Sequence, residues 1–309
     1  MNFKRVIEAP ILALLFLTIF VYAIFGVQNF FDFLSQNMKN SQLSASVLGP
    51  TQDFQLQNES PGVQVPAVAE NAEPDISAES AISVRSDLYG AKNILFEKQS
   101  LEKLPIASLT KLMTAIVVLE NYNLSDTGVV TVVADAQSPM KQDVKLGDVM
   151  SVQDFLDIML VGSSNKSAYA LADMIGVEKF VGLMNQKADD LGLKITHFKD
   201  PTGLSPENVS TAYELAQLAE YILNNYPQIA EVSKQKELYV PKFGNVINTD
   251  ELLDEPLSAV FSKTGFTNEA KGCLLLVLKD SKSADYFINV ILGANDRFSE
   301  MQKLISASQ

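Results

Sequence analysis

Residues 105 to 119 read PIASLTKLMTAIVVL, an apolar segment with one serine and one lysine near its start. Its apolar residues recur every three or four positions, which predicts a helix with one face in the core. Ser108 and Lys111 are three residues apart and therefore share a helix face. Burial lowers the pKa of a lysine, and a lysine that is partly neutral can act as the base for a neighbouring serine. The segment predicts both a core helix and a nucleophile.

Context separates this pair from the other Ser-x-x-Lys pairs of the chain. The five pairs are Ser100/Lys103, Ser108/Lys111, Ser138/Lys141, Ser163/Lys166 and Ser233/Lys236. Ser100 is expected in a polar loop, Pro139 follows Ser138 directly, and Ser233 borders a basic stretch that we expect to be solvated. Because only Ser108 opens a long apolar helix, we predict Ser108 as the nucleophile and Lys111 as its base.

Two further motifs lie downstream of this pair. Ser163-Ser164-Asn165 is expected at a turn between two helices, and Lys263-Thr264-Gly265 at the end of an apolar strand. Each motif alone is common. The ordered set Ser-x-x-Lys, Ser-x-Asn, Lys-Thr-Gly resembles the signature of the penicillin-interacting serine enzymes.

A longer resemblance covers the chain from about Ala81 to Ser306. The segments that carry it are LPIASLTKLMTA (104–115), DPTGL (200–204) followed by STAY (210–213), and KTGFT (263–267) leading into Gly272-Cys273. They are similar to segments of the D-alanyl-D-alanine carboxypeptidases, the low-molecular-mass penicillin-binding proteins. That family folds as an antiparallel sheet flanked by a helical subdomain, so the resemblance implies a β-lactamase/DD-peptidase-like fold here.

The resemblance also implies roles for the residues around the nucleophile. Ser108 Oγ would attack the peptide carbonyl between two D-alanines at the end of a peptidoglycan stem peptide, and Lys111 would take its proton. Ser163 would relay a proton to the leaving amine, and Asn165 would orient Lys111 and the substrate amide. β-Lactam antibiotics are then expected as covalent inhibitors, and the reaction needs no metal or cofactor.

The third motif is expected to bind the substrate. By the same resemblance, Lys263 and Thr264 would hold the terminal carboxylate. Gly265 has no side chain, which lets the substrate backbone approach the strand. The N–H groups of Ser108 and Phe266 would form the oxyanion hole.

Composition argues against several other classes of protein. The 309 residues include 24 Lys and Arg against 37 Asp and Glu, for a formal net charge of -13, so we expect no nucleic-acid partner. One His and one Cys cannot form a His/Cys zinc site or an intramolecular disulfide. We predict that His197 is a structural or surface residue and that Cys273, in an apolar strand, belongs to the core.

Hydrophobic periodicity predicts strands at both ends of the domain and helices between them. The expected strands are 81–84 and 93–96, joined as a hairpin around Tyr89-Gly90, then 129–133, 238–240, 246–248, 259–263, 272–278 and 287–292. The expected helices are 109–119, one that begins at Ser151, 166–175, 177–191, 211–223 closed by Pro227, and 296–305. This order predicts an α+β fold, with an antiparallel sheet built from the first and last segments and an inserted helical subdomain.

The N-terminal part of the chain is expected to lie outside this domain. Residues 9–27 are apolar and uncharged, long enough to span a bilayer, and Lys4 and Arg5 precede them. We predict one transmembrane signal anchor within 1–34, with a cleaved signal peptide as the alternative, a flexible linker over 35–80 and a catalytic domain over 81–309. The protein would then be a single-pass protein of the cell membrane with its catalytic domain outside.

Two features depart from the family pattern. Lys166 stands where the family usually has Asp and is expected to add a cation beside the cleft. Only two strands and a helix are expected after Gly265, so we expect the second β-domain of typical members to be missing and the N-terminal helix to supply the anchor.

Other interpretations use the same motifs. A class A β-lactamase adds a deacylating Glu in Glu-x-x-Leu-Asn, and residues 220–224 contain that string, but inside an amphipathic helix. A transpeptidase would use the same acyl-enzyme with an amine acceptor. A wall-associated pseudo-enzyme would keep the fold without turnover, although the retained motif residues argue against it.

Overall fold

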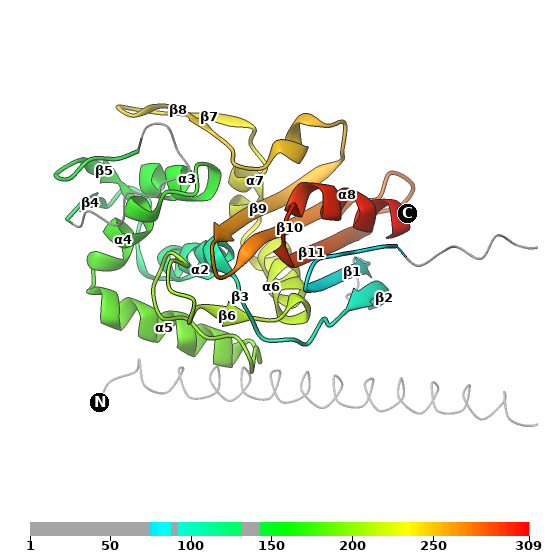
Figure 1. The fold of residues 1–309 in the computed structure, drawn as a ribbon. Helices are drawn as coiled ribbons and strands as arrows, with labels where there is room; N and C mark the ends of the chain where they lie inside the picture. Colours follow the sequence, from blue (N-terminus) through cyan, green and yellow to red (C-terminus); the bar gives the residue numbers. More distant parts are fainter. Residues whose placement is uncertain (1–73, 88–91, 132–142, 309) are drawn as a thin grey trace, which may run out of the picture. The chain divides into compact units, whose positions relative to one another are not determined.

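The computed structural model describes residues 74–87, 92–131 and 143–308 (Figure 1). All of them belong to one unit of the chain, residues 70–309. The expected anchor and most of the expected linker lie outside the described residues, as do the hairpin turn at Tyr89-Gly90 and the pair Ser138/Lys141. Within the described ranges, no helix is long and apolar enough to cross a membrane.

Five antiparallel strands form the central sheet, in the order β2-β1-β11-β10-β9. Their bounds are β1 (Ser80–Ser86), β2 (Lys92–Lys98), β9 (Ala259–Thr267), β10 (Lys271–Lys279) and β11 (Tyr286–Ala294). The first strand of the domain pairs directly with the last, and the Ser83 hydroxyl donates to Asn289 Oδ1 at 2.8 Å between them. The predicted α+β fold, with a helical part inserted between the outer strands, is confirmed.

The inserted part lies between β2 and β9 and is mainly helical. Its helices are η1 (Ala107–Thr110), α2 (Lys111–Asn121), α3 (Val152–Val161), α4 (Asn165–Asp173), α5 (Val177–Asp190), α6 (Ala212–Asn225), α7 (Pro227–Ser233) and η2 (Glu251–Asp254). Three two-stranded sheets accompany them: β3 (Leu104–Pro105) with β6 (Val209–Ser210), β4 (Thr127–Val129) with β5 (Val149–Ser151), and β7 (Glu237–Val240) with β8 (Gly244–Ile247). Helix α2 is buried from Lys111 to Val118, which makes it the core helix that residues 105–119 predict.

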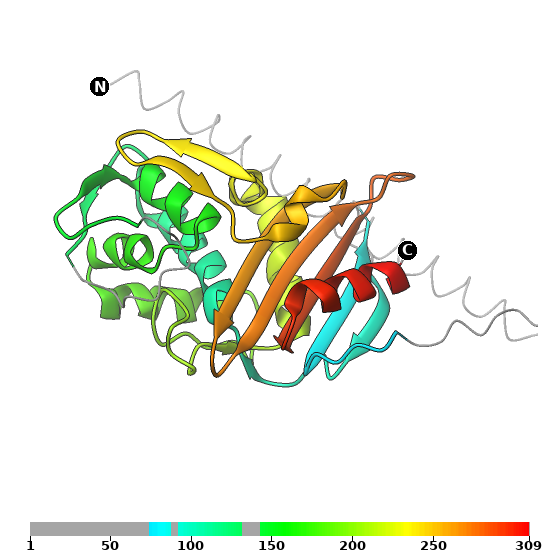
Figure 2. The ribbon, with the colours of Figure 1, turned by 45° about the horizontal axis from the view of Figure 1, so that its top comes forward.

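Helices cover both faces of the sheet (Figure 2). Helix α8 (Arg297–Ser308) packs on one face, in a core cluster with Leu274 and Leu276 of β10. Helix α6 packs on the opposite face, in a second cluster that contains Leu275 and Val277. Successive side chains of a strand point to opposite faces, so the buried residues 272–278 of β10 contribute to both cores.

Helix starts follow local signals in the sequence. Ser151 Oγ accepts from Asp154 N at 3.1 Å and Asp154 Oδ2 accepts from Ser151 N at 3.3 Å, a capping box that starts α3 where the sequence predicts it. Pro227 differs from expectation. It follows α6 but is also the first residue of α7, because proline needs no N–H partner in the first helical turn.

Other local differences come from tertiary packing. Strand β4 ends at Val129, earlier than the expected strand 129–133, whose last residues lie outside the described part of the chain. Ser233 is fully buried at the end of α7 and donates to Ala230 O, although the basic stretch beside it predicts solvent exposure. Ser100 lies in a turn after β2, as the sequence predicts, and its side chain is buried.

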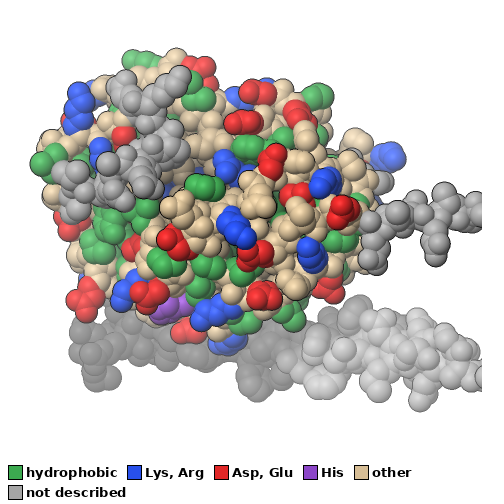
Figure 3. Space-filling model, in the orientation of Figure 1, with side chains coloured by type: hydrophobic (Ala, Val, Ile, Leu, Met, Phe, Trp, Pro, Cys, Tyr) green, Lys and Arg blue, Asp and Glu red, His purple; other side chains and the backbone are tan. Residues whose placement is uncertain are grey.

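Surface and core residues otherwise agree with their predicted places. Basic and acidic side chains are interspersed on the face shown in Figure 3, and the single histidine, His197, is exposed. Cys273 is fully buried in β10, and burial raises the pKa of its thiol to about 12. A thiol in that state is an unreactive core residue.

Candidate active site

A cavity of 250 Å³ lies where the end of β9 passes the start of α2. Six of the eight predicted site residues line it: Ser108, Ser163, Asn165, Thr264, Gly265 and Phe266. The other two, Lys111 and Lys263, are buried behind the wall and reach it through hydrogen bonds to Ser108 and Ser163. The structure therefore brings all eight residues together at one place.

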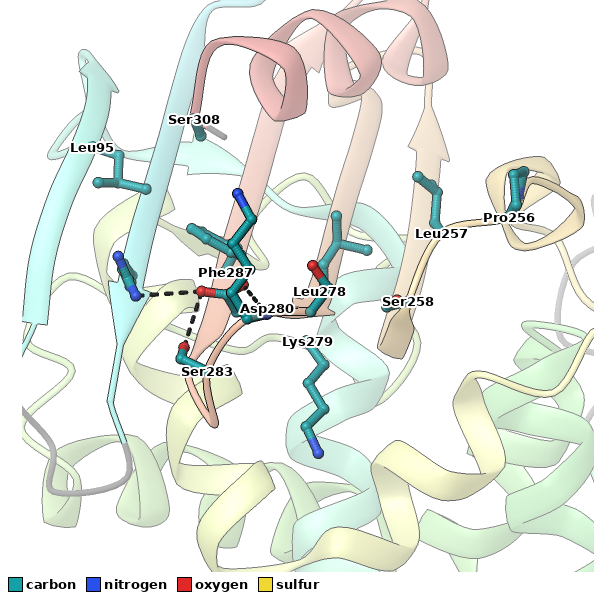
Figure 4. A pocket seen from close by; sticks show the side chains of 13 residues that line it. Leu95, Pro256, Leu257, Ser258, Leu278, Lys279, Asp280, Ser283, Phe287 and Ser308 are labelled. Atoms are coloured by element: carbon teal, nitrogen blue, oxygen red, sulfur yellow. Dashed lines mark hydrogen bonds and ion pairs between the residues drawn. The ribbon is translucent and has the colours of Figure 1, made fainter.

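A larger cavity of 440 Å³ lies at the other end of the sheet, around the loop between β10 and β11 (Figure 4). Asp280 projects into this region and accepts a hydrogen bond from the Ser283 hydroxyl at 2.9 Å. Among the described residues, no serine hydroxyl on its walls is hydrogen-bonded to a lysine amine. Because a serine nucleophile needs a base within hydrogen-bond reach, the smaller cavity is the candidate active site.

Lys111 is placed by the junction of η1 and α2. It is the first residue of α2, and its Nζ donates to Ser108 Oγ, to Asn165 Oδ1 and to the carbonyl oxygen of Thr202, each at 2.8 Å. The amide and carbonyl oxygens can only accept hydrogen bonds, whereas a hydroxyl can also donate. When Lys111 is neutral, Ser108 is the one partner of the three that can give its proton to the amine.

The surroundings favour the neutral amine. The pKa of Lys111 is well below its usual value, chiefly because the side chain is completely buried and secondly because Lys263 is close. Asp200 and Asp143 oppose this shift without cancelling it. Burial is the cause that the apolar pattern of residues 105–119 predicts.

Backbone geometry places the Ser-x-Asn motif. Ser163 has a left-handed conformation, with φ of 60°, which turns the chain from α3 into α4. Ser164 then caps α4 by accepting from Ser167 N at 3.1 Å, and its hydroxyl donates to Asp143 Oδ1 at 2.7 Å. Asn165 is consequently the first helical residue, with its side chain directed at Lys111.

Lys263 extends from β9 toward the second serine. Its Nζ donates to Ser163 Oγ at 2.9 Å and to Thr264 O at 3.1 Å. The pKa of Lys263 is lowered to about 7, chiefly by burial and secondly by Arg297, while Asp250 opposes the shift. Near neutral pH this side chain can therefore carry a positive charge beside the cavity.

Gly265 serves a purpose beyond substrate approach. A Cβ at this position would lie 3.0 Å from Ser108 N and 3.1 Å from Ile106 O. The absence of a side chain at residue 265 therefore lets strand β9 lie close to the backbone of residues 106–108. The next residue, Phe266, is 60% exposed at the mouth of the cavity.

The loop after Asp200 carries a contact that the sequence does not reveal. The buried Asp200 carboxylate accepts hydrogen bonds from Thr202 N and Oγ1, both at 2.6 Å, from Gly203 N at 2.8 Å and from Ser205 N at 2.7 Å. These bonds fix the carbonyl group of Thr202 against Lys111. The DPTGL segment signals the family, but a backbone carbonyl has no signature that would predict this role.

Two further residues of the cavity wall come from elements remote in sequence. Arg297, the first residue of α8, reaches the cavity, and within the described structure its buried Nε has no hydrogen-bond partner. Its guanidinium lies 4.5 Å from the centre of the Phe298 ring. Thr249 also lines the cavity and its hydroxyl is hydrogen-bonded to that of Thr264. Arg297 adds a cation that can attract a carboxylate.

Two sequence features lie apart from the cavity. Lys166 does not line it, and its Nζ donates to Val144 O at 3.1 Å, so this lysine joins α4 to the segment before β5. Glu220 lies in α6, where it accepts from the Ser86 hydroxyl at 2.7 Å and pairs with Lys92. The Glu-x-x-Leu-Asn string is thus part of a helix packed on the sheet, far from a deacylating position.

The described ranges contain no group of three or more His, Cys, Asp or Glu side chains arranged to hold a metal ion. What the cavity and its wall do contain is a serine hydroxyl, a buried amine that can accept its proton, a second Ser–Lys pair and the guanidinium of Arg297. Such a set can form and break an acyl ester next to a bound anion.

Fold and site together indicate a serine enzyme in which the candidate nucleophile is hydrogen-bonded to a buried lysine. The family model for D-alanyl-D-alanine carboxypeptidases, peptidase family S11, matches residues 67–296. The chain belongs to this family of serine DD-peptidases.

Individual relatives agree with that assignment. The chain is similar to the D-alanyl-D-alanine carboxypeptidase DacF of Bacillus subtilis, with 32% identity over 244 residues, 74% of this chain and 61% of that protein. It is also similar to the D-alanyl-D-alanine endopeptidase of Escherichia coli, with 33% identity over 75% of this chain and 77% of that protein. The match thus spans about three-fifths of the Bacillus protein's length.

Solved structures agree as well. Penicillin-binding protein D2 from Listeria monocytogenes, in its cefotaxime-bound form, has a TM-score of 0.69 and 27% sequence identity to this chain. The comparison covers 75% of this chain and 97% of that one. The β-lactamase/DD-peptidase-like fold implied by the motifs is therefore the observed one.

Proposed function

We propose that this chain is a serine-type D-alanyl-D-alanine carboxypeptidase that removes the terminal D-alanine from peptidoglycan stem peptides and is acylated by β-lactams. The observation that carries the proposal is the environment of Lys111, whose only partner able to donate a proton is Ser108. Burial holds the pKa of Lys111 low, so the amine can accept that proton. A scaffold protein would need neither feature.

The reaction follows from these contacts. Ser108 Oγ bonds to the carbonyl carbon of the penultimate D-alanine while its proton passes to Lys111. The C–N bond to the last D-alanine then breaks, and the proton that Lys111 accepted passes to the departing amine, relayed by Ser163, which is hydrogen-bonded to Lys263. Water then adds to the resulting ester, and the neutral Lys111 takes a proton from the water. Lys111 returns this proton to Ser108 Oγ as the ester C–O bond breaks, which regenerates Ser108 and releases the peptide with a free carboxylate.

The terminal carboxylate of the substrate binds at one end of the cleft. Lys263, Thr264 and Arg297 supply two cations and a hydroxyl there. The N–H groups of Ser108 and Phe266 hold the oxyanion. This cluster favours a carboxypeptidase, because D-alanine at a peptide terminus carries a free carboxylate next to the cleaved bond.

Relatives that are named endopeptidases make the choice of substrate the decisive test. We expect the purified chain to release D-alanine from a synthetic pentapeptide ending in D-Ala-D-Ala faster than it cleaves a cross-linked dimer of stem peptides, with no product from Ser108→Ala. Cleavage of the dimer alone would make the chain an endopeptidase. Transfer of the acyl group to an added amine in preference to water would make it a transpeptidase.

Penicillin separates the remaining alternatives. Intact mass after incubation with benzylpenicillin is expected to show a lasting adduct on the wild type and none on Ser108→Ala. Rapid hydrolysis of penicillin without an adduct would identify a β-lactamase. Intact penicillin without an adduct would identify a non-catalytic protein.

We also propose that residues 9–27 anchor the chain in the cell membrane with the enzyme outside. The proposal rests on the uncharged apolar run and the preceding Lys4 and Arg5. The full chain should sediment with membranes and be released by detergent but not by alkaline carbonate, whereas a chain without residues 1–34 should stay in the supernatant. A mature protein that begins well after Val27 would contradict the anchor.

A further inference from the structure

Asp250 is a buried carboxylate that does not line the candidate active-site cavity. It lies between β8 and η2, and only 3% of it is exposed. Its Oδ1 accepts from Leu252 N at 3.0 Å, which caps η2, and its Oδ2 accepts from the Ser262 hydroxyl. Ser262 precedes Lys263 on β9, so one hydrogen bond ties the carboxylate to the strand that carries the cleft lysine and the other ties it to η2.

The charge of Asp250 acts on two cations of the cleft. Lys263 of β9 and Arg297 of α8 both interact electrostatically with it. Within the described residues, neither cation forms an ion pair with Asp250 closer than 4.0 Å, so the carboxylate acts without occupying the groups that face the substrate. The other acidic groups near Arg297 are Glu251 of η2 and Asp296 before α8.

Without a buried anion this end of the cleft would be electrostatically unfavourable. Lys263 is completely buried, Arg297 is close enough to lower the pKa of Lys263, and Lys263 in turn lowers the pKa of Lys111. When like charges lie close together in a desolvated site, the cation with the lowest pKa loses its proton most readily. Asp250 opposes that loss at Lys263, the group whose charge the substrate carboxylate needs.

We propose that Asp250, buried and hydrogen-bonded to the residue before Lys263, is a positioning residue that keeps Lys263 protonated and thereby sets the upper pH limit of Ser108 acylation. Asp250 does not touch the substrate and acts through Lys263. The inference rests on the proposed function, because it assumes that the cleft binds a carboxylate while Ser108 is acylated.

Asp250→Asn tests the charge separately from the hydrogen bonds. The amide keeps an acceptor for Leu252 N and can donate to Ser262 Oγ. Lys263 has a pKa of about 7, and a negative charge nearby raises it, so removing that charge lowers it. The descending limb of the pH profile should therefore move to lower pH.

The measurement is the second-order rate of acylation by benzylpenicillin between pH 5 and 9, with the melting temperature recorded for each variant. We expect the wild-type rate to fall as the pH rises above about 7, and the limb of Asp250→Asn to lie about 0.5 to 1 pH unit lower, within the usual size of such charge effects. At pH 8 this shift corresponds to a several-fold loss, and at pH 5.5 the loss should disappear.

Asp280→Asn is the matched control. Asp280 also accepts from the backbone N–H two residues on, Lys282 N at 2.8 Å, and from a serine hydroxyl, Ser283, but it lies in the cavity at the other end of the sheet (Figure 4). Its substitution should leave the pH limb unchanged. Ser262→Ala keeps the Asp250 carboxylate but removes the Ser262 hydrogen bond, which favours the charged form of Asp250. This variant should therefore move the descending limb of the pH profile to lower pH, but by less than Asp250→Asn does.

The possible results are distinct. An unchanged pH limb in both Asp250→Asn and Ser262→Ala, or an equal loss of rate at every pH together with a lower melting temperature, would show that Asp250 is only structural and would overturn the inference. No acylation of the wild type at any pH would overturn the proposed function itself. A descending limb of the pH profile that shifts in the Asp250 and Ser262 variants, but not in Asp280→Asn, supports both the inference and the proposed function.

Discussion

Replacing Lys111 by methionine is expected to slow acylation of Ser108 by about 10²- to 10⁴-fold, the contribution of a general base. Methionine fills a similar volume but cannot accept the proton of the Ser108 hydroxyl. The rate is measured from intact mass against time after mixing with benzylpenicillin. The melting temperature should change little, because the gain from removing an amine that is costly to bury is offset by the loss of its three hydrogen bonds to buried acceptors.

Lys103→Met is the control for this substitution. Lys103 belongs to another Ser-x-x-Lys pair, but it is exposed and remote from the cavity. Its removal should leave the acylation rate within about twofold, since exposed side chains away from a site have small effects. If Lys111→Met is acylated as fast as Lys103→Met, another group must be the base.

Gly203→Ala is expected to destabilise the protein strongly, and more than Gly192→Ala. Gly203 has φ of 88°, and a Cβ there would lie 1.8 Å from the carbonyl oxygen of Ala107 and 2.3 Å from its carbon. The backbone next to Ser108 would have to move, at a cost of several kcal/mol. For a domain of this size, about 3 kcal/mol lowers the melting temperature by roughly 6 to 12 °C.

Gly192→Ala separates the steric clash from backbone strain. Gly192 also has a positive φ, 74°, but nothing lies within 4 Å of a Cβ added there. This variant should carry only the strain of an unfavourable conformation, about 1 to 3 kcal/mol. Thermal unfolding of both variants checks the difference, and equal shifts would show that the contact with Ala107 can relax without cost. Loss of penicillin acylation in Gly203→Ala, but not in Gly192→Ala, is expected as well.

Sequence patterns predicted the architecture because each element carries its own signal. The apolar period of residues 105–119 predicts the buried α2, and Ser151 predicts the start of α3, where it is the N-cap. Pro227 was ambiguous for a physical reason, since a proline is compatible both with the end of one helix and with the first turn of the next. The position of Ser233 depended on tertiary packing, which a local basic stretch does not report.

For the candidate site, the ordered motifs predicted which side chains meet, and the structure adds what holds them. The carbonyl of Thr202 reaches Lys111 through a loop shaped by Asp200, and no residue type predicts a backbone contact of that kind. Asp250 precedes β9 in the sequence, between β8 and η2, and Arg297 follows β9, at the start of α8. Their effect on the pKa of Lys263 depends on burial and distance. Such electrostatic relations appear only once the chain is folded.

The pairing of β1 with β11 sets an order of events during biosynthesis. Residues near position 80 enter the centre of the sheet only after residues near position 290 exist, because Ser83 pairs with Asn289. A ribosome must therefore release almost the whole domain before its sheet can assemble, and contacts of such long sequence separation form slowly. Until then the strand faces that α6 and α8 later cover remain open to proteases and chaperones. Ser108 and Lys111 lie in the first third of the domain, whereas Lys263 lies in β9, so a chain that ends before β9 lacks the complete site.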